Sequence, residues 1–238
     1  MPTWNLDETR EHVTRLFGRG QLDLAAPSIT SVDDRQTYAR IHFFAARSAI
    51  EVYLLDELQD TSLLEITFGG DSERWDKFNI FTREVGAHLT ACVQSMHAVP
   101  DILGHAIHYS LGFNLLADAM KSRDIRAYSV SAQLKRDAKY ATLAALFDQL
   151  IAQGDFGHLS ALANQAKHRS IVLPSLNEDL TGERATRYVI TFPRFECKGN
   201  TYKLVVAEEF LKAEFARASA LVVKIGCELN ALLLAHTV

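Results

Sequence analysis

Cysteine and proline are scarce in this chain of 238 residues, which has three cysteines and five prolines. The cysteines at positions 92, 197 and 227 are odd in number and far apart. This pattern excludes the disulfide framework of a small secreted protein and also a cysteine-rich zinc site. Such cysteine usage is typical of a reducing compartment, and the first residues lack the basic start and apolar run of a secretory signal. We therefore predict a cytoplasmic protein.

Several familiar signatures are also missing. The sequence has no glycine-rich phosphate loop, dinucleotide-binding fingerprint, nucleophile elbow or Cys/His redox pair, which argues against those enzyme classes. The formal net charge of −4 gives no overall attraction to nucleic acid or to an anionic membrane. The most apolar stretch, residues 218–238, is interrupted by Lys224, Glu228 and Asn230. We read it as a helix of a soluble protein and predict no membrane contact.

A helical period runs through most of the chain, and 48% apolar residues suffice for a sizeable core. It predicts helices over about residues 7–17, 31–58, 72–96 and 101–120, one around 143–150, one from Asp155 to before Pro174, and one at the carboxy terminus. Gly18, Gly20 and Pro27 predict a loop, and Ser31 begins a pattern typical of a capping box. Pro100 predicts either a break between two helices or a kink in one.

Two apolar stripes stand out. In segment 31–58 the stripe consists of Ile41, Phe44, Ser48, Val52 and Leu55. In the last helix it consists of Leu211, Phe215, Ala218, Val222, Ile225, Leu229 and Leu232. The second stripe fits either the core of a bundle or a dimer seam, and its length of only about three heptads favours the bundle.

Residues 185–206 depart from the helical pattern. The segments 187–192 and 201–206 are rich in β-formers and flank the turn signal Gly199-Asn200, and Pro193 suggests an edge or a bulge. We predict a β-hairpin insertion over residues 185–206. The predicted fold is mainly α: an antiparallel helical bundle with a small β-hairpin insertion, forming a single helical domain over residues 1–238.

The segment 164–168 carries the most informative polar pattern. At about 100° per residue, Asn164, Lys167 and His168 lie on one side of a helix. Leu159 and Leu162 lie on the other. The three polar residues then face solvent, a cleft or a partner, although an Asn and a His four residues apart can also simply bond along the helix surface.

The pattern Asn164-x-x-x-His168 on a short helix of an α-helical domain resembles the HEPN superfamily signature Arg-Asn-x-x-x-His. Ala163 stands where the active members carry arginine, and Lys167 adds a cation. The resemblance implies a dimer whose ribonuclease site lies at the subunit interface, in toxin, phage-defence or RNA-processing settings. Many relatives are inactive binding modules.

This resemblance leaves two functions open. In a metal-independent ribonuclease, His168 would act as general acid or base, Lys167 would stabilise phosphate charge and Asn164 would orient the groups. Arg83 could supply the missing positive charge if it lay near His168. Loss of the family arginine removes a bidentate phosphate donor that lysine cannot replace. We therefore favour a catalytically altered module that binds nucleic acid or nucleotide, in a bacterial stress or phage-defence setting, without a cofactor.

Three further features give alternatives. Lys135, Arg136 and Lys139 could form a phosphate-binding surface or a solvated helix face. Asp101, His105 and His108 recur at helical spacing and could supply ligands for a divalent metal in a hydrolase. The carboxy-terminal stripe and the hairpin could instead serve a non-enzymatic homodimer or another interaction surface. The predicted partners are a second copy of the chain and RNA or a nucleotide.

Overall fold

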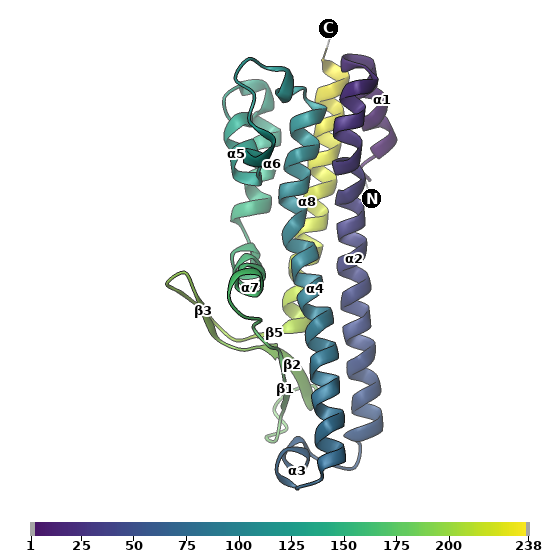
Figure 1. The fold of residues 1–238 in the computed structure, drawn as a ribbon, viewed down its shortest axis with the longest axis vertical. Coiled ribbons are helices and arrows are strands. Elements are labelled where there is room, and N and C mark those ends of the chain that lie inside the picture. Colours follow the sequence, from purple (N-terminus) through teal and green to yellow (C-terminus); the bar gives the residue numbers. More distant parts are fainter. Residues whose placement is uncertain (1–2, 237–238) are drawn as a thin grey trace. The chain divides into compact units, whose positions relative to one another are not determined.

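The computed structural model describes residues 3–236 and is mainly α with a small β insertion, as predicted (Figure 1). The helices within these residues are α1 (Leu6–Phe17), α2 (Arg19–Glu57), α3 (Leu63–Phe68), α4 (Ser72–Ser110), α5 (Ala127–Leu134), α6 (Ala141–Ala152), α7 (Phe156–His168) and α8 (Ala207–Ala235). The strands are β1 (Ser175–Glu178), β2 (Tyr188–Phe192), β3 (Phe195–Cys197), β4 (Asn200–Tyr202) and β5 (Val205–Val206).

The chain divides into two compact units, each assembled from separate segments. Of the described residues, the first unit contains 3–37, 96–157 and 214–236, and the second contains 38–95 and 158–213. The core of the first unit includes Leu103, Ile107, Leu143, Phe147 and Ile225, all fully buried. The core of the second includes Val85, Leu89, Leu159, Phe192 and Leu211. The single helical domain over residues 1–238 stays a prediction from the sequence.

Helix α1 begins and ends as its sequence predicts. The side chain of Asn5 accepts a hydrogen bond from the Glu8 amide at 3.2 Å, and Gly18 ends the helix with φ of 82°. The expected loop after Gly18 is wrong, because α2 begins at Arg19 and runs through Pro27. Ala25 and Ile29, on either side of this proline, are fully buried. Their burial offsets the cost of a proline inside a helix.

Ser31 is therefore not a helix start but lies inside α2. Helix α4 likewise runs through Pro100 as one continuous helix. Of the two alternatives predicted there, the break between two helices is therefore wrong. Helix α4 ends at Ser110 instead of near residue 120. Gly112 follows with φ of 68°, and a Cβ at this position would lie 2.9 Å from the Phe17 ring. The close approach of that ring and the left-handed backbone both favour glycine here.

The carboxy-terminal stripe lies partly in the protein core. Leu211, Val222, Ile225 and Leu229 are each at most 2% exposed, as in the core of a bundle, whereas Phe215, Ala218 and Leu232 are half-buried. Among the helices of residues 3–236, α8 alone is long and apolar enough to cross a membrane, and 39% of its most apolar window is buried. A core helix of a soluble protein passes the same test, and the structure fits a soluble protein.

The predicted hairpin is present but is divided into two parts. Strand β2 pairs with β5 through Thr191 and Val206, and β3 pairs with β4 through Glu196 and Thr201. Pro193 lies between the two parts, as its edge or bulge signal predicts. The turn uses Lys198 and Gly199, both with positive φ, one residue earlier than predicted. Strand β1, which the sequence pattern missed, pairs antiparallel with β2 on its other edge.

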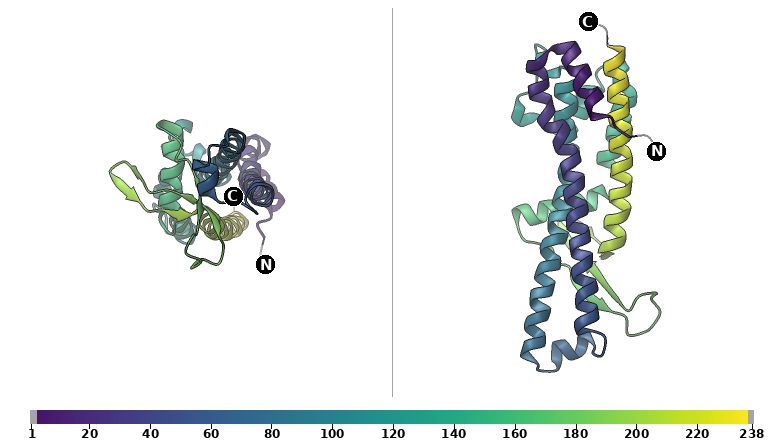
Figure 2. Two further views of the ribbon diagram at one scale, coloured as in Figure 1. Left: turned by 90° about the horizontal axis from the view of Figure 1, so that it is seen from below. Right: turned by 90° about the vertical axis from the view of Figure 1, so that its right-hand side faces the viewer.

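In the second unit, the end of α2 and the start of α4 lie side by side and antiparallel, joined through α3 (Figures 1 and 2). The Tyr53 ring stacks on the Phe81 ring with centroids 4.0 Å apart. The Nδ1 atoms of His42 and His88 lie 3.1 Å apart between the same two helices. These contacts fix the pair of helices that carries the groove described below.

Candidate functional site

Helix α7 presents the predicted polar motif at its carboxy-terminal end. Leu159, Leu162 and Ala163 form its buried side, with at most 4% exposure. The ring of His158, near the start of α7, lies 5.0 to 5.5 Å from the rings of Phe195, Tyr202 and Phe210. The start of the helix is thus anchored in an aromatic cluster, whereas its last turn extends into solvent.

The three polar residues of the motif occupy different environments. Lys167 and His168 are exposed, and Asn164 is half-buried. The amide of Asn164 donates a hydrogen bond to Ser160 Oγ at 3.2 Å, one turn earlier in the same helix. Asn164 is therefore held by its own helix, while the ring of His168 and the ammonium of Lys167 are accessible.

Arg169 extends this group, and the sequence pattern missed it. Its amide donates to the Gln165 carbonyl at 2.9 Å, which continues the last turn of α7, and its side chain is exposed. Within residues 3–236, the side chains of Lys167, His168 and Arg169 have no hydrogen-bond or ion-pair partner. We name these three residues the α7 cation cluster. Arg169 lies outside the five-residue motif, and only its position directly after His168 could have identified it from the sequence.

The α7 cation cluster lies on an open surface. A nearby cavity lined by Leu162, Ala166 and Phe192, among others, has a volume of only about 10 Å³. It is too small for a nucleotide base. Lysine and arginine side chains at a helix carboxy terminus also interact favourably with the negative end of the helix dipole, so Lys167 and Arg169 are favourable there without an anionic side chain nearby.

Arg83 is exposed on α4, and within residues 3–236 no hydrogen bond or ion pair joins its side chain to another residue. Its contribution to the positive charge near His168 stays a prediction. The end of α7 brings Lys167 and His168 together with Arg169.

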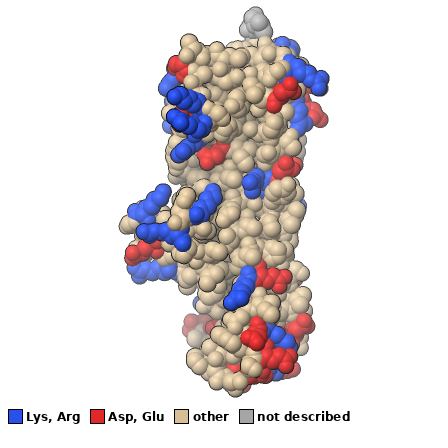
Figure 3. All heavy atoms as spheres, viewed as in Figure 1, with Lys and Arg blue, Asp and Glu red and all other residues tan. Residues whose placement is uncertain are grey.

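The second predicted basic group is neutralised by neighbours in the first unit. Lys135 pairs with Asp148 at 2.6 Å, Arg136 with Asp118 at 3.2 Å, and Lys139 with Asp137 at 3.2 Å. Each of these three cations thus faces its own carboxylate. On the face shown in Figure 3, lysine and arginine side chains form several small groups with acidic side chains among them. Such a mixed surface attracts phosphate less than an unpaired basic patch would.

The three predicted metal ligands have separate roles. Asp101 Oδ1 accepts a hydrogen bond from the Ala127 amide at 2.8 Å and so holds the start of α5. His108 is fully buried, with Nδ1 3.3 Å from Gln133 Oε1, and burial lowers its pKa. His105 is half-buried. Among the residues described, no group of three or more His, Cys, Asp or Glu is placed to hold a metal ion.

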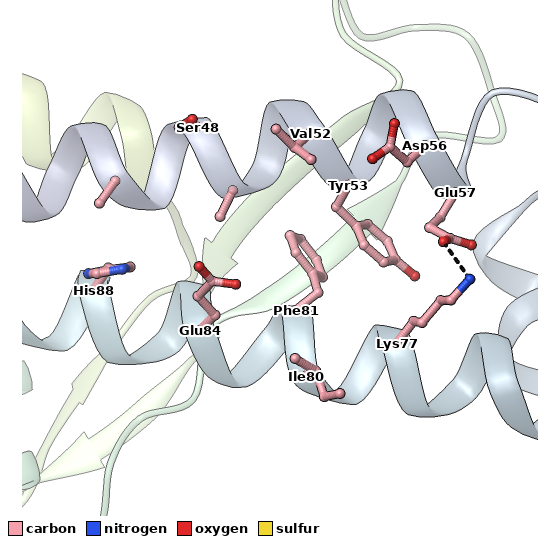
Figure 4. A pocket seen from close by; sticks show the side chains of 12 residues that line it. Ser48, Val52, Tyr53, Asp56, Glu57, Lys77, Ile80, Phe81, Glu84 and His88 are labelled. Atoms are coloured by element: carbon pink, nitrogen blue, oxygen red, sulfur yellow. Dashed lines mark ion pairs between the residues drawn. The ribbon is translucent and has the colours of Figure 1, made fainter.

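A cavity lies in the second unit, between α2 and α4 (Figure 4). It has a volume of about 570 Å³. Ser48, Val52 and Asp56 of α2 line it, together with Ile80 and Glu84 of α4. An ion pair between Glu57 and Lys77, with an N–O distance of 3.1 Å, closes one end. We name this cavity the α2–α4 groove.

Comparison with known proteins gave no match to any family model, curated protein or solved structure.

Proposed function

We propose that the α7 cation cluster binds the phosphate groups of a nucleic acid or nucleotide, and that the chain is a catalytically altered, HEPN-like binding module of the cytoplasm. A bacterial stress or phage-defence setting follows from the HEPN resemblance. The observation that carries the proposal is the contrast between two basic groups. Lys167, His168 and Arg169 have no anionic partner within residues 3–236, whereas Lys135, Arg136 and Lys139 each have one.

The residue types suit this role. Arginine offers a planar fork of donors that can hold a phosphate at two points, and lysine adds a compact charge. The ring of His168 supplies a further donor, or in a reactive site a general acid or base. Arg169 thus offers, six positions later, the kind of phosphate donor that Ala163 lacks.

Binding is favoured over cleavage because the chemistry of cleavage needs more than one positioned group. A metal-independent phosphodiesterase must move a proton and also stabilise charge on the phosphate in a fixed geometry. Asn164 is bonded to Ser160 instead of His168, and no hydrogen bond joins Arg83 to His168 within residues 3–236. Turnover would therefore require groups from elsewhere.

A salt-dependent binding measurement tests the proposal. The anisotropy of a labelled single-stranded RNA is followed with the wild type, with the double variant Lys167→Ala/Arg169→Ala, and with the matched control Lys135→Ala/Lys139→Ala. The slope of log K against log salt is negative for the wild type. If both mutated cations contact phosphates, this slope should become less steep by about 1.4 in the first variant. The control should keep the wild-type slope. Equal losses in the two variants, or no measurable binding by the wild type, would reject the site.

An RNA-cleavage assay separates binding from catalysis. Incubation of the wild type and His168→Ala with a long unstructured RNA should give no cleavage that depends on His168. Cleavage by the wild type that disappears in His168→Ala would instead establish the ribonuclease alternative at the same site.

A further inference from the structure

Helix α2 carries two apolar stripes in the second unit, and only one of them is buried. Ala39, Ala46 and Tyr53 recur every seven residues, are at most 7% exposed, and form the buried side. The other stripe remains on the surface, although it has the spacing of a packed helix. It consists of Ile41 (56% exposed), Phe44 (55%), Ser48, Val52 (54%) and Leu55 (61%). We name it the α2 seam.

The spacing of the α2 seam reads the same in both directions. Its steps are three, four, four and three residues, with Ser48 at the centre, and its members lie within an arc of about 80°. A second identical helix running in the opposite direction therefore presents the same pattern at the same heights. Such a pairing places Ser48 against Ser48 of the second copy, Phe44 against Val52, and Ile41 against Leu55.

The middle of the α2 seam is shaped for close approach. Ala45, Ser48 and Ala49 have small side chains, and all three line the α2–α4 groove (Figure 4). Small residues at a crossing point allow two helix backbones to come close, and larger residues on either side can then interdigitate. Ile80 of α4, 67% exposed, adds apolar surface at the same groove.

The polar edges of the α2 seam complement each other in the same register. On one edge lie Arg47 and Glu51, paired within the protomer at 2.8 Å. An antiparallel copy brings its Glu51 beside Arg47 and its Arg47 beside Glu51, which joins two ion pairs into one network. On the other edge, Tyr38 of each copy comes near Asp56 of the other, offset by two positions or about 3 Å along the helix. Both of these side chains are exposed and have no internal partner within residues 3–236.

The exposed area is of the size that marks an interface. If about half of each of Tyr38, Ile41, Phe44, Val52 and Leu55 is accessible, the apolar patch is on the order of 500 Å² per copy. With its polar edges it approaches the roughly 800 Å² per partner of a standard interface. The contact would extend for about 27 Å along the helix.

We propose that a second copy of this chain packs antiparallel on the α2 seam, with a two-fold axis near Ser48. This inference rests on the second unit alone and does not depend on the α7 cation cluster. Loss of RNA binding would leave it intact, and a monomeric protein would leave the phosphate proposal intact.

Solution mass is the first test. Sedimentation velocity of the full chain should give a dimer at micromolar concentration, and Phe44→Glu should weaken the dimer by at least tenfold in its dissociation constant, because it buries a carboxylate in the seam. Phe68→Glu is the matched control, since Phe68 is 79% exposed and lies outside the seam. A monomeric wild type, or a dimer that survives Phe44→Glu with unchanged affinity, overturns the proposal.

A mixture of two charge-reversal variants tests the antiparallel register. Both variants keep the apolar residues of the α2 seam unchanged. Arg47→Glu gives each chain two acidic residues at this edge, and Glu51→Arg gives each chain two basic ones. Each variant alone should dimerise at least tenfold more weakly than the wild type, and an equimolar mixture should form a heterodimer of near wild-type affinity. Two variants that dimerise as well alone as together would overturn the antiparallel register.

Discussion

Arg217 holds the buried carboxylate of Glu214 at two points, with N–O distances of 2.6 and 2.8 Å. The side chain of Glu214 is 1% exposed and that of Arg217 is 22% exposed. The same guanidinium donates to the carbonyl oxygens of Gln149 and Leu150 at 2.8 and 3.0 Å. These carbonyls lie in the last turn of α6, where intrahelical donors are missing. One side chain of α8 thus neutralises a buried charge and also caps α6.

Substitution of this arginine should be among the most destabilising single changes in the first unit. Arg217→Gln leaves Glu214 buried without its partner, and removal of one member of a buried pair typically costs about 3–5 kcal/mol. Because Arg217 is partly exposed, we expect the lower end, about 3 kcal/mol, from urea unfolding. The double variant Glu214→Gln/Arg217→Gln removes the stranded charge and should recover part of the loss. A single variant as stable as the wild type would show that this pair contributes little.

Two helical glycines should respond in opposite directions to alanine. A Cβ at Gly226 of α8 would lie 2.1 Å from the ring of Trp4, so Gly226→Ala forces this ring to move. We expect it to destabilise the protein by about 1–3 kcal/mol despite the better helix propensity of alanine. Gly157 in the first turn of α7 has open space around it, and Gly157→Ala should stabilise the protein by up to about 1 kcal/mol.

Thermal unfolding followed by circular dichroism measures both glycine variants under the same conditions. Tryptophan emission adds a local readout, since a displaced Trp4 ring changes its environment only in Gly226→Ala. Stabilisation by both alanines would mean that Trp4 does not lie against α8 as described.

His108 should make the stability depend on pH. Burial lowers the pKa of this histidine below its ordinary value of 6.5, against the opposing effect of the Gln133 hydrogen bond. The unfolded chain therefore takes up a proton near pH 6.5, where folded His108 does not. Its contribution to stability is complete above that pH and is lost as the pH falls toward the folded pKa.

Urea midpoints at about pH 7.5 and about pH 5.5 measure this dependence. The wild type should lose more stability between the two values than His108→Gln, in which this group cannot titrate. The comparison between proteins removes the contribution of the other histidines. An equal loss in both proteins would assign the pH dependence to other groups.

A cysteine placed at the centre of the α2 seam should link two copies. In the proposed dimer, Ser48→Cys brings two sulfurs together at the two-fold axis, and mild oxidation should give a covalent dimer on a non-reducing gel. Leu55→Cys is the matched control, because residue 55 and its copy would be separated by about 21 Å along the helices. The wild type sets the background from Cys92, Cys197 and Cys227. Equal cross-linking in both variants would point to random collision.

The helix content could be predicted from the sequence because it follows from local period and caps. The predicted α1 differs from the observed helix by one residue, and four of the seven residues of the carboxy-terminal stripe are buried. Local rules failed where burial outweighed them: Pro27 lies inside α2 because its neighbours Ala25 and Ile29 are part of the core. Strand β1 was missed because its sequence, Ser-Leu-Asn-Glu, has little strand preference, and its pairing with β2 supplies the hydrogen bonds.

The candidate site was predictable in part for the same reason. The helical period alone places Lys167 and His168 on the polar side of α7, and both are exposed. Pairing between distant segments could not be read from the pattern. Lys135 lies 13 positions from Asp148, yet the two form an ion pair at 2.6 Å, which removes an apparently basic patch. His108 and Asp101 share a helical spacing but are separately engaged with Gln133 and Ala127.

By itself the sequence determined the helical class, the hairpin and the polar face of α7, since each depends on residues near one another in the chain. It also contained the stripe Ile41, Phe44, Ser48, Val52 and Leu55. Only the tertiary structure decided which side of α2 is buried, because Ala39, Ala46 and Tyr53 show a competing period and burial depends on which partner helices are present. It likewise decided which cations remain unpaired, because charge neutralisation depends on distances between segments that no local pattern fixes.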